Sequence, residues 1–468
     1  MNVMPLKFRP VGKQGFIFCD DAGGFFRSND AFLERYVQDG MTAEDQAFLK
    51  TNGHAFDSVG DLAYNAFSYR WAKRLHVPPD LDYVILVPTL RCNLACAYCQ
   101  VSRVNENAPG HDWDAATLHA VLGWLDGLST TTIKIEFQGG EPLLRLDVLE
   151  EVRAFARERF ENADFVICTN LQDVSEAAWD FLASEDTFVS TSLDPTRELH
   201  ERHRTSGTVA TQQFLENLAR ATSKWPDRVS ALPTFDLDAL PDPREVIDAY
   251  SFFGLRSIYL RPVNHQGFAR KRFRTQYMSA VWNAYVRRSI MTLIEYNATS
   301  EWPMEEYYFS HCLRRVVRGG HDGHVDLRNP NIVGRSYVVI DHDGSFYPTD
   351  EARMITRLGQ IDLRMGDVRT GMDRTIVEAL NTEALNLFDP DCVHCPYQAF
   401  CGVDLIDDLS RYGRIDLPRH LTDFCQRHMS IFDLVFELLY SDDPKVRQSI
   451  ALWSGLDEID PELTKVHQ

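Results

Sequence analysis

At 468 residues the chain is too long for one compact domain, and two or three domains are expected. Its 68 Asp and Glu against 48 Lys and Arg give a formal charge of −20, which repels phosphate backbones and anionic lipids, so we expect no nucleic-acid or membrane partner. No apolar stretch approaches the roughly 18 residues of a membrane span, and residues 1–12 lack a signal-peptide core, so the sequence predicts a cytoplasmic protein.

Residues 1–80 have the pattern of a small α+β domain in which strands precede helices. A strand is expected around Phe8, and residues 15–26 have the pattern of a hairpin with a glycine-containing turn. Asn29 and Thr42 are favourable N-caps, and apolar residues follow each of them at helical spacing. Two helices are therefore expected after the hairpin.

Residues 81–298 alternate strand and helix patterns. Between the first two strands, for example, Leu118, Val121, Leu122 and Leu125 form one apolar helix face. Successive βα units favour a parallel sheet with right-handed crossovers and a site at the carboxyl ends of the strands. Six strands are expected, two fewer than a full eight-stranded barrel needs: Tyr83–Val87, Ile133–Phe137, Phe165–Cys168, Phe188–Ser192, Val229–Leu232 and Ser257–Leu260.

Residues 299–440 lose this alternation, and residues 441–468 are taken as a C-terminal tail. A hairpin is predicted around the turn pair Asp343-Gly344. A second group of cysteines follows, and then an amphipathic helix from about 430 to 439.

Seven of the ten cysteines fall into two groups, which in a reducing compartment favours metal ligands over disulfides. The first group is Cys92, Cys96 and Cys99, directly after the first strand of the second region. Three thiolates can hold one corner of an iron–sulfur cube and leave its fourth iron open to another ligand. A zinc site completed by a distant His fits these cysteines equally well.

Polar residues stand where most of the predicted strands end, at the rim where a cofactor is expected. The paired glycines at the end of the second strand allow a close backbone approach. Any one of these residues fits a plain βα turn, but the ordered succession of glycines and polar residues, with Arg204 following the fourth strand end, favours a site: Gly139, Gly140, Glu141, Asn170, Ser192, Arg204 and Arg261.

The second cysteine group has the spacing C-x2-C-x5-C with a distant fourth thiol. This spacing permits zinc or a [4Fe–4S] cluster, and a first cluster in the same chain favours a second. His394, inside the motif, is expected to be exposed or to lie outside the ligand set. The four candidate ligands are Cys392, Cys395, Cys401 and Cys425.

The C-x3-C-x2-C motif followed by Gly-Gly-Glu-Pro resembles the signature of the radical SAM superfamily, over about residues 81–270. The resemblance implies a partial (β/α)6 TIM-like barrel and a [4Fe–4S] cluster on the first cysteine group that cleaves S-adenosylmethionine (SAM). It also implies a cofactor-binding set: Tyr98 against the adenine, Gly139, Gly140 and Glu141 at the amino group, Ser192 and Arg204 at the carboxylate or ribose, and Asn170 and Arg261 at the same strand ends.

The third region resembles the SPASM domain, a C-terminal iron–sulfur extension of radical SAM enzymes that modify peptides. Its full pattern has seven cysteines and two auxiliary clusters, and the second group here matches the outer one. Thr349 and Leu405 stand where inner-cluster cysteines are expected, although Cys312 matches the first inner position. The resemblance therefore implies two [4Fe–4S] clusters, one that binds SAM and one auxiliary cluster with four protein ligands.

The segment around Cys92–Cys99 most resembles radical SAM maturases of the His-Xaa-Ser peptide system. This resemblance implies a precursor-peptide substrate, an intrapeptide crosslink of the cyclophane type or related, and an electron donor such as flavodoxin or ferredoxin. Residues 1–80 are reminiscent of domains that bind leader peptides by strand addition, although a packing cap fits equally well. Two alternatives stay open: a sulfatase-maturase-like oxidation of a protein side chain, and a non-catalytic iron–sulfur partner protein.

Asp350 and Glu351 follow the predicted hairpin, which in SPASM enzymes faces the barrel mouth. One of them is a candidate catalytic group that accepts a proton or docks substrate, and a solvated carboxylate pair is the simpler interpretation. Cys168 is expected to be a small buried apolar residue on its strand.

Overall fold

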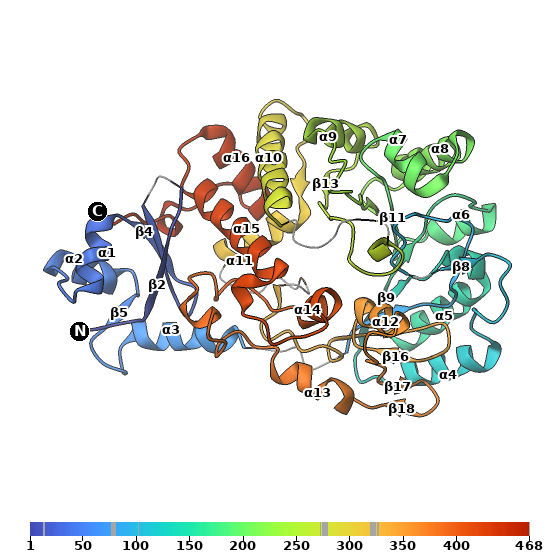
Figure 1. Cartoon of the computed structure of the whole chain (residues 1–468), viewed down its shortest axis with the longest axis horizontal. Helices are drawn as coiled ribbons and strands as arrows, with labels where there is room; N and C mark the ends of the chain where they lie inside the picture. The colour runs from blue at the N-terminus through green and yellow to red at the C-terminus, as the bar shows by residue number, and fades with distance from the viewer. Residues whose placement is uncertain are drawn as a thin grey trace.

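The computed structural model describes residues 1–12, 15–75, 81–101, 103–271, 273, 279–318, 324 and 327–467. A small N-terminal sheet stands at one end, C-terminal helices occupy the centre, and a sheet with an outer layer of helices forms the other end (Figure 1). None of the described helices is long and apolar enough to cross a membrane.

A parallel sheet forms the second region, as the strand spacing predicts. Among the described residues it has seven strands in the order β12-β11-β10-β9-β6-β15-β16, and every pair is parallel except β15 with β16. The strands are β6 (Tyr83–Leu86), β9 (Thr132–Phe137), β10 (Asn162–Cys168), β11 (Thr187–Thr191), β12 (Val229–Ala231), β15 (Tyr337–Ile340) and β16 (Phe346–Tyr347).

The sixth predicted strand differs from the expectation. It is short, β13 (Ser257–Ile258), and it pairs in parallel with β14 (Glu305–Glu306) instead of joining β12. A single bridge between Phe235 and Pro262 links this part to the chain that follows β12. The hairpin predicted around Asp343-Gly344 forms, and its first strand β15 extends the sheet beside β6. Residues of the third region therefore complete the barrel wall.

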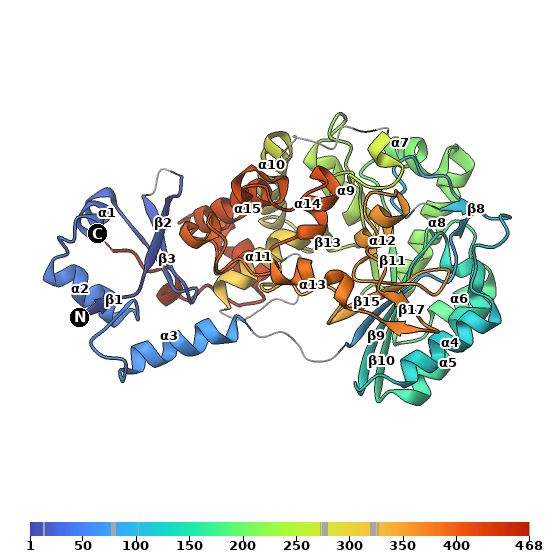
Figure 2. The ribbon, with the colours of Figure 1, turned by 60° about the horizontal axis from the view of Figure 1, so that its bottom comes forward.

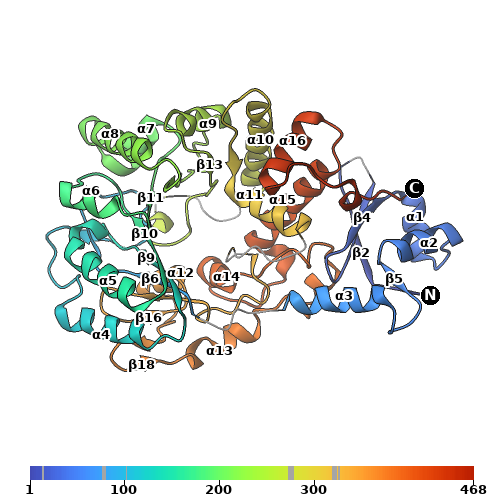
Figure 3. The ribbon, with the colours of Figure 1, turned by 180° about the vertical axis from the view of Figure 1, so that it is seen from behind.

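Alternation along β9 separates the core from the interior of the barrel. Ile133, Ile135 and Phe137 are buried, whereas Lys134 and Glu136 on the other face line a cavity. Outside this sheet lie the helices α4 (Ala115–Asp126), α5 (Leu146–Arg159), α6 (Glu176–Leu182), α7 (Arg197–His200), α8 (Thr208–Lys224) and α9 (Pro243–Phe252), as Figure 3 shows from behind.

The N-terminal region forms its predicted hairpin and both predicted helices. The sheet β2-β3-β4 is antiparallel (Leu6–Pro10, Phe16–Asp20, Phe25–Ser28), with a small pair β1 (Asn2–Val3) and β5 (Ala55–Phe56) beside it. Asn29 caps α1 (Asp30–Val37), and Thr42 forms a capping box at α2 (Ala43–Thr51). A third helix, α3 (Leu62–Lys73), was not predicted, because its apolar residues form no single stripe, and it extends away from the sheet (Figure 2).

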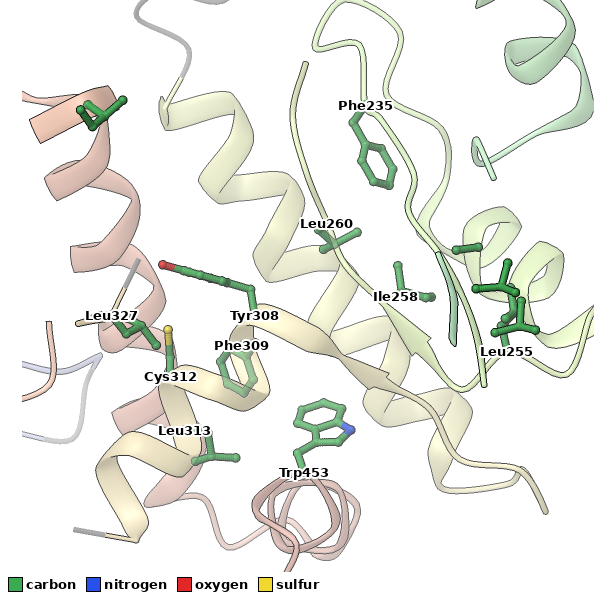
Figure 4. Packing of buried hydrophobic residues seen from close by; sticks show 14 of the residues in the cluster. Phe235, Leu255, Ile258, Leu260, Tyr308, Phe309, Cys312, Leu313, Leu327 and Trp453 are labelled. Carbon is green, nitrogen blue, oxygen red and sulfur yellow. The ribbon is translucent and has the colours of Figure 1, made fainter. Parts of the chain in front are cut away.

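Helices from the end of the second region, from the third region and from the C-terminal tail pack into one bundle. The predicted helix near 430–439 begins earlier, as α15 (Asp423–Leu439), and packs against α10 (Ser279–Asn297), α11 (Tyr307–Val317) and α16 (Pro444–Ser454). Trp453 of α16 lies beside Phe309 of α11, in the cluster that also holds Ile258 of β13 (Figure 4). The remaining elements here are α12 (Asp350–Arg357), β17 (Gly366–Asp367), β18 (Gly371–Met372), α13 (Thr375–Thr382) and α14 (Leu405–Tyr412).

Candidate functional site

The first cysteine group lies on a loop that the paired glycines hold in place. Cys92 ends the short strand β7 (Arg91–Cys92), which pairs with β8 (Val104–Asn105). The backbone N–H of Gly140 donates to the carbonyl of Thr89 at 3.0 Å. A Cβ at Gly140 would lie 2.1 Å from the carbonyl oxygen of Arg91, and Gly139 has a φ of +127°. The close approach that these glycines permit is therefore to the backbone of the cysteine loop.

The three thiols open into one cavity of about 930 Å³ inside the barrel. Burial, followed by the neighbouring carboxylate and thiols, raises the pKa of the Cys92 thiol to about 12, and burial raises that of Cys96 to about 11. Buried thiols of this kind ionise when a bound cation compensates their charge. Three thiols that line one cavity and ionise on binding a cation fit a metal ion or an iron–sulfur cluster.

Glu141 and Asn170 connect the glycine segment, Gly139 and Gly140, to the end of β10. The Glu141 carboxylate accepts from the backbone N–H of Asn170 at 2.8 Å and of Leu143 at 3.1 Å. The Asn170 side chain then donates to Asn93 Oδ1 at 2.8 Å and contacts Cys92 Sγ at 3.7 Å. Burial raises the pKa of Glu141 to about 7. Glu141 thus positions Asn170 against the cysteine loop.

A buried ion pair supports Tyr98 on the other side of the loop. Arg204 donates to both carboxylate oxygens of Asp194, at 2.9 and 3.0 Å, and Tyr98 donates its hydroxyl hydrogen to the same carboxylate. Burial opposes ionisation of Asp194, but the Arg204 charge outweighs it and lowers the pKa of Asp194. The guanidinium lies 5.0 Å from the centre of the Tyr98 ring. Asp194 was missed as a functional residue, because its partners lie on other elements.

The other predicted strand-end residues also line the cavity. Ser192 follows β11, and Arg261 follows β13 with its guanidinium 5.4 Å from the ring of Tyr259. The sequence therefore brings the strand-end set together around the three thiols, with Glu141 buried and engaged by backbone N–H groups.

A carboxylate that sequence reasoning missed lies farther along the cavity wall. Glu136 accepts from Tyr83, from Gln138 Nε2 at 2.6 Å and from the Cys168 thiol at 3.2 Å. Cys168, expected to be a small buried apolar residue, instead lines the same cavity and donates its thiol hydrogen to a carboxylate. The alternation of β9 indicates which residues face inward but not what they contact.

Asp350 and Glu351 both line this cavity, from the start of α12. Asp350 is 7% exposed and pairs with Arg353 at 2.8 Å. Burial raises the pKa of Asp350, and Arg353 opposes the rise. The interpretation as a solvated pair is wrong for Asp350, because Arg353, itself buried and bonded to Asp341, draws the carboxylate inward.

The second cysteine group lines a separate cavity of about 710 Å³, together with part of β2. Burial raises the pKa of each of the four thiols, to about 12 at Cys425. The charges of Cys395, Cys392, Cys425 and Cys312 add to the rise at Cys401. Cys312 is fully buried in the apolar cluster of α11 (Figure 4), and His394 is exposed.

Sequence comparison relates the barrel to a known family. Residues 86–242 match the family model described as "Radical SAM superfamily". An uncharacterized protein of Methanocaldococcus jannaschii is 31% identical over 116 residues, which are 24% of this chain and 39% of that protein. An uncharacterized protein of Methanothermobacter thermautotrophicus is 27% identical over 132 residues, which are 27% of this chain and 47% of that protein. The chain thus spans less than half the length of these curated relatives.

Solved structures share the wider fold. AdoMet-bound anSMEcpe superposes with a TM-score of 0.60 at 18% identity, covering 79% of this chain and 99% of that protein. Streptococcus suis SuiB bound to the precursor peptide SuiA superposes with a TM-score of 0.53 at 12% identity, covering 91% of this chain and 100% of that protein. The α/β fold is therefore shared beyond the barrel.

Proposed function

We propose that this chain, whose residues 86–242 form a radical SAM domain, is a peptide maturase that abstracts hydrogen from a ribosomally made precursor peptide. The product we propose is an intrapeptide crosslink of the cyclophane type or related. The observation that carries the proposal is that Cys92, Cys96 and Cys99 open into one cavity with the polar strand ends. That anSMEcpe and SuiB were solved with bound peptides supports a peptide substrate.

The first cavity fits a [4Fe–4S] cluster held by its three thiols, with room for SAM. When bound, the reduced cluster would supply the electron for reductive cleavage of SAM, which is the chemistry that removes a hydrogen atom from a peptide carbon. The glycine segment keeps the cysteine loop in place, and Asn170 contacts the loop at Cys92. The cofactor-binding role is proposed for Tyr98, Gly139, Gly140, Glu141, Asn170, Ser192, Arg204 and Arg261.

Asp350 and Glu351 remain candidates for accepting a proton or docking the peptide. Both lie on α12 at the wall of the cavity, and their negative charge is opposite to the positive charge of Lys134 and Arg261 in the same lining. Arg353 fixes the Asp350 carboxylate, so this group is positioned before substrate arrives.

The second cavity fits an auxiliary [4Fe–4S] cluster with four thiolate ligands. With no vacant position, such a cluster conducts electrons or clamps the fold instead of binding substrate. A one-electron donor of the flavodoxin or ferredoxin class completes the proposal, together with a cytoplasmic location that keeps ten thiols reduced. We also propose that residues 1–80 are a separate peptide-recognition domain.

The cluster assignment is tested by anaerobic reconstitution followed by SAM and dithionite. We expect about eight irons per wild-type chain and about four after Cys92, Cys96 and Cys99 are replaced by Ala, with 5′-deoxyadenosine formed only by the former. Cys19→Ala is the matched control, because this buried cysteine lies on β3, outside both cavities. Bound zinc with no 5′-deoxyadenosine would overturn the proposal.

The peptide assignment is tested by co-expression with the precursor peptide encoded beside the gene. Tandem mass spectrometry should find the loss of two hydrogens, with fragments missing between two joined residues. A change confined to one side chain would instead support the oxidase alternative. An unchanged peptide with no SAM cleavage would support a non-catalytic role.

A further inference from the structure

The outer edge of β4 is covered by a distant segment of the same chain. The backbone N–H of Arg27 donates to the carbonyl of Lys465 at 3.0 Å, and the N–H of His467 donates back to the carbonyl of Arg27 at 2.8 Å. Arg27 and Val466 form a parallel bridge, and Ser28 Oγ donates to the His467 carbonyl, 439 residues away, at 2.8 Å. Residues 465–467 therefore act as an added fourth strand. The chain terminus lies beside α1 and β4 in two views (Figures 1 and 3).

A side-chain pocket anchors this added strand. His467 is 6% exposed, and its Nε2 lies 2.6 Å from the Asp45 carboxylate. Its ring stacks on Phe48 with centroids 4.3 Å apart and meets Phe32 edge-on at 5.0 Å. Hydrogen bonds from Arg35 lower the pKa of Asp45, so the carboxylate stays ionised toward an imidazole donor. We name Asp45, Phe48 and Phe32 the imidazole pocket.

The cover is short compared with the edge it occupies. Only Arg27 of β4 (Phe25–Ser28) bridges to it, and Val466 is 46% exposed. The opposite edge strand, β2, is instead fixed by side chains, since Arg9 forms a two-bonded pair with Asp433 at 2.7 and 2.9 Å. Among the described residues, the β4 edge is thus the edge of this sheet that a peptide can occupy. A longer strand there would form more backbone hydrogen bonds than residues 465–467 do.

We infer that the β4 edge and the imidazole pocket are a peptide-binding site that residues 465–467 close in cis. The partner that fits is an extended peptide segment carrying a histidine, which adds beside β4 and places its imidazole on Asp45. Such a partner must displace the internal segment, so the site is gated by the chain itself. This site lies within the peptide-recognition domain proposed for residues 1–80. It rests on that proposed function only for the identity of the peptide as a precursor.

The site is tested with the full chain and a synthetic probe. The probe is a fluorescein-labelled peptide of residues 461–467, Pro-Glu-Leu-Thr-Lys-Val-His. His467→Ala in the protein should empty the pocket, so fluorescence anisotropy should show the variant binding the probe about tenfold or more tightly than wild type does. Circular dichroism and 5′-deoxyadenosine formation without peptide should match wild type, which separates this test from that of the proposed function.

Two matched probes check the mode of binding. Replacing the histidine of the probe by Ala should abolish binding, whereas replacing its lysine should preserve it, because Lys465 accepts the hydrogen bond from β4 through its backbone carbonyl. Equal probe binding by wild type and His467→Ala would show that the edge is not closed in cis. No binding to either protein would show that residues 465–467 are purely structural, and either result overturns the inference.

Discussion

The two cysteine groups are built in different ways. The first gathers three thiols on one loop, which contacts the glycine segment backbone to backbone and faces a cavity with charged walls. The second gathers four thiols from separate segments, around Cys392, at Cys401 and on α15, and strand β2 of the N-terminal sheet shares its cavity.

Under the proposed function, this difference separates a reactive site from a closed one. In the first cavity, polar side chains and the three thiols line one space, and the position of the cysteine loop depends on backbone contacts at Gly139 and Gly140 that leave no room for an added atom. In the second, the proposed cluster would have one thiol for each of its four irons. A substitution that disturbs this backbone fit should therefore damage the first site and leave the second intact.

Gly140→Ala should produce the largest effect, the loss of the first site. The added Cβ would meet the Arg91 carbonyl oxygen at 2.1 Å, and a backbone atom cannot swing aside. We expect iron to fall from about eight to about four per chain and SAM cleavage to stop. Gly123→Ala is the matched control, since its Cβ would meet nothing within 4 Å on α4. Full iron in Gly140→Ala would contradict the backbone account of the loop.

Asp194→Asn should be the next most severe. The carboxylate is 1% exposed, and its removal leaves the Arg204 guanidinium without a counter-charge, at about 3 kcal/mol. The lowered pKa of Asp194 means that the pair stabilises fully above the ordinary Asp range and loses this contribution as the pH falls. Urea unfolding should therefore show a difference from wild type that is largest near neutral pH and shrinks in acid.

The control for this prediction is an exposed pair of the same type. Arg244 and Asp248 lie 2.8 Å apart with more than half of each side chain exposed. Asp248→Asn should change the unfolding free energy by about 0.5 kcal/mol or less. Equal losses of unfolding free energy at both positions would mean that the buried Asp194 pair stabilises the fold no more than an exposed pair does.

Glu141 should give a smaller effect that depends on pH. Because burial raises its pKa to about 7, the folded chain holds a proton that the unfolded chain releases above the ordinary value of 4.5. Stability should therefore fall as the pH rises from about 5 to about 7, by at most about 1.4 kcal/mol per pH unit from this group. Glu141→Gln should flatten that slope in urea unfolding between these values. An unchanged slope would place the titration elsewhere.

Much of the fold was predictable where the signal is local. Asn29 and Thr42 cap their helices as expected, and the turn pair at Asp343-Gly344 closes its hairpin. The pairing of β15 with β6 was not predictable, because strand patterns show which residues form a strand but not which distant strand lies beside it. The same limit explains the position of β13, which pairs with β14 of the next region.

The site follows the same division. Its cysteine spacing and strand-end residues are visible in the chain, and the structure brings all of them except the buried Glu141 to the lining of one cavity. Asp194 and Glu136 were missed because their contacts come from other strands and helices. Asp350 was expected in solvent because the sequence does not show that Arg353 is buried. In the structure Arg353 lies beside Asp341 and pairs with Asp350, which holds the Asp350 carboxylate in the interior.

Cys312→Ala should have the smallest effect and sharpens the count of ligands at the second site. Cys312 is fully buried among Phe309, Leu313 and Leu327 (Figure 4), so its removal should cost about 1 kcal/mol as a small cavity. Iron should stay at about eight per chain, whereas Cys425→Ala should lose up to about four. If Cys312→Ala loses iron as Cys425→Ala does, the second site has a fifth thiol ligand or a second auxiliary cluster, and the contrast of one open and one closed site fails.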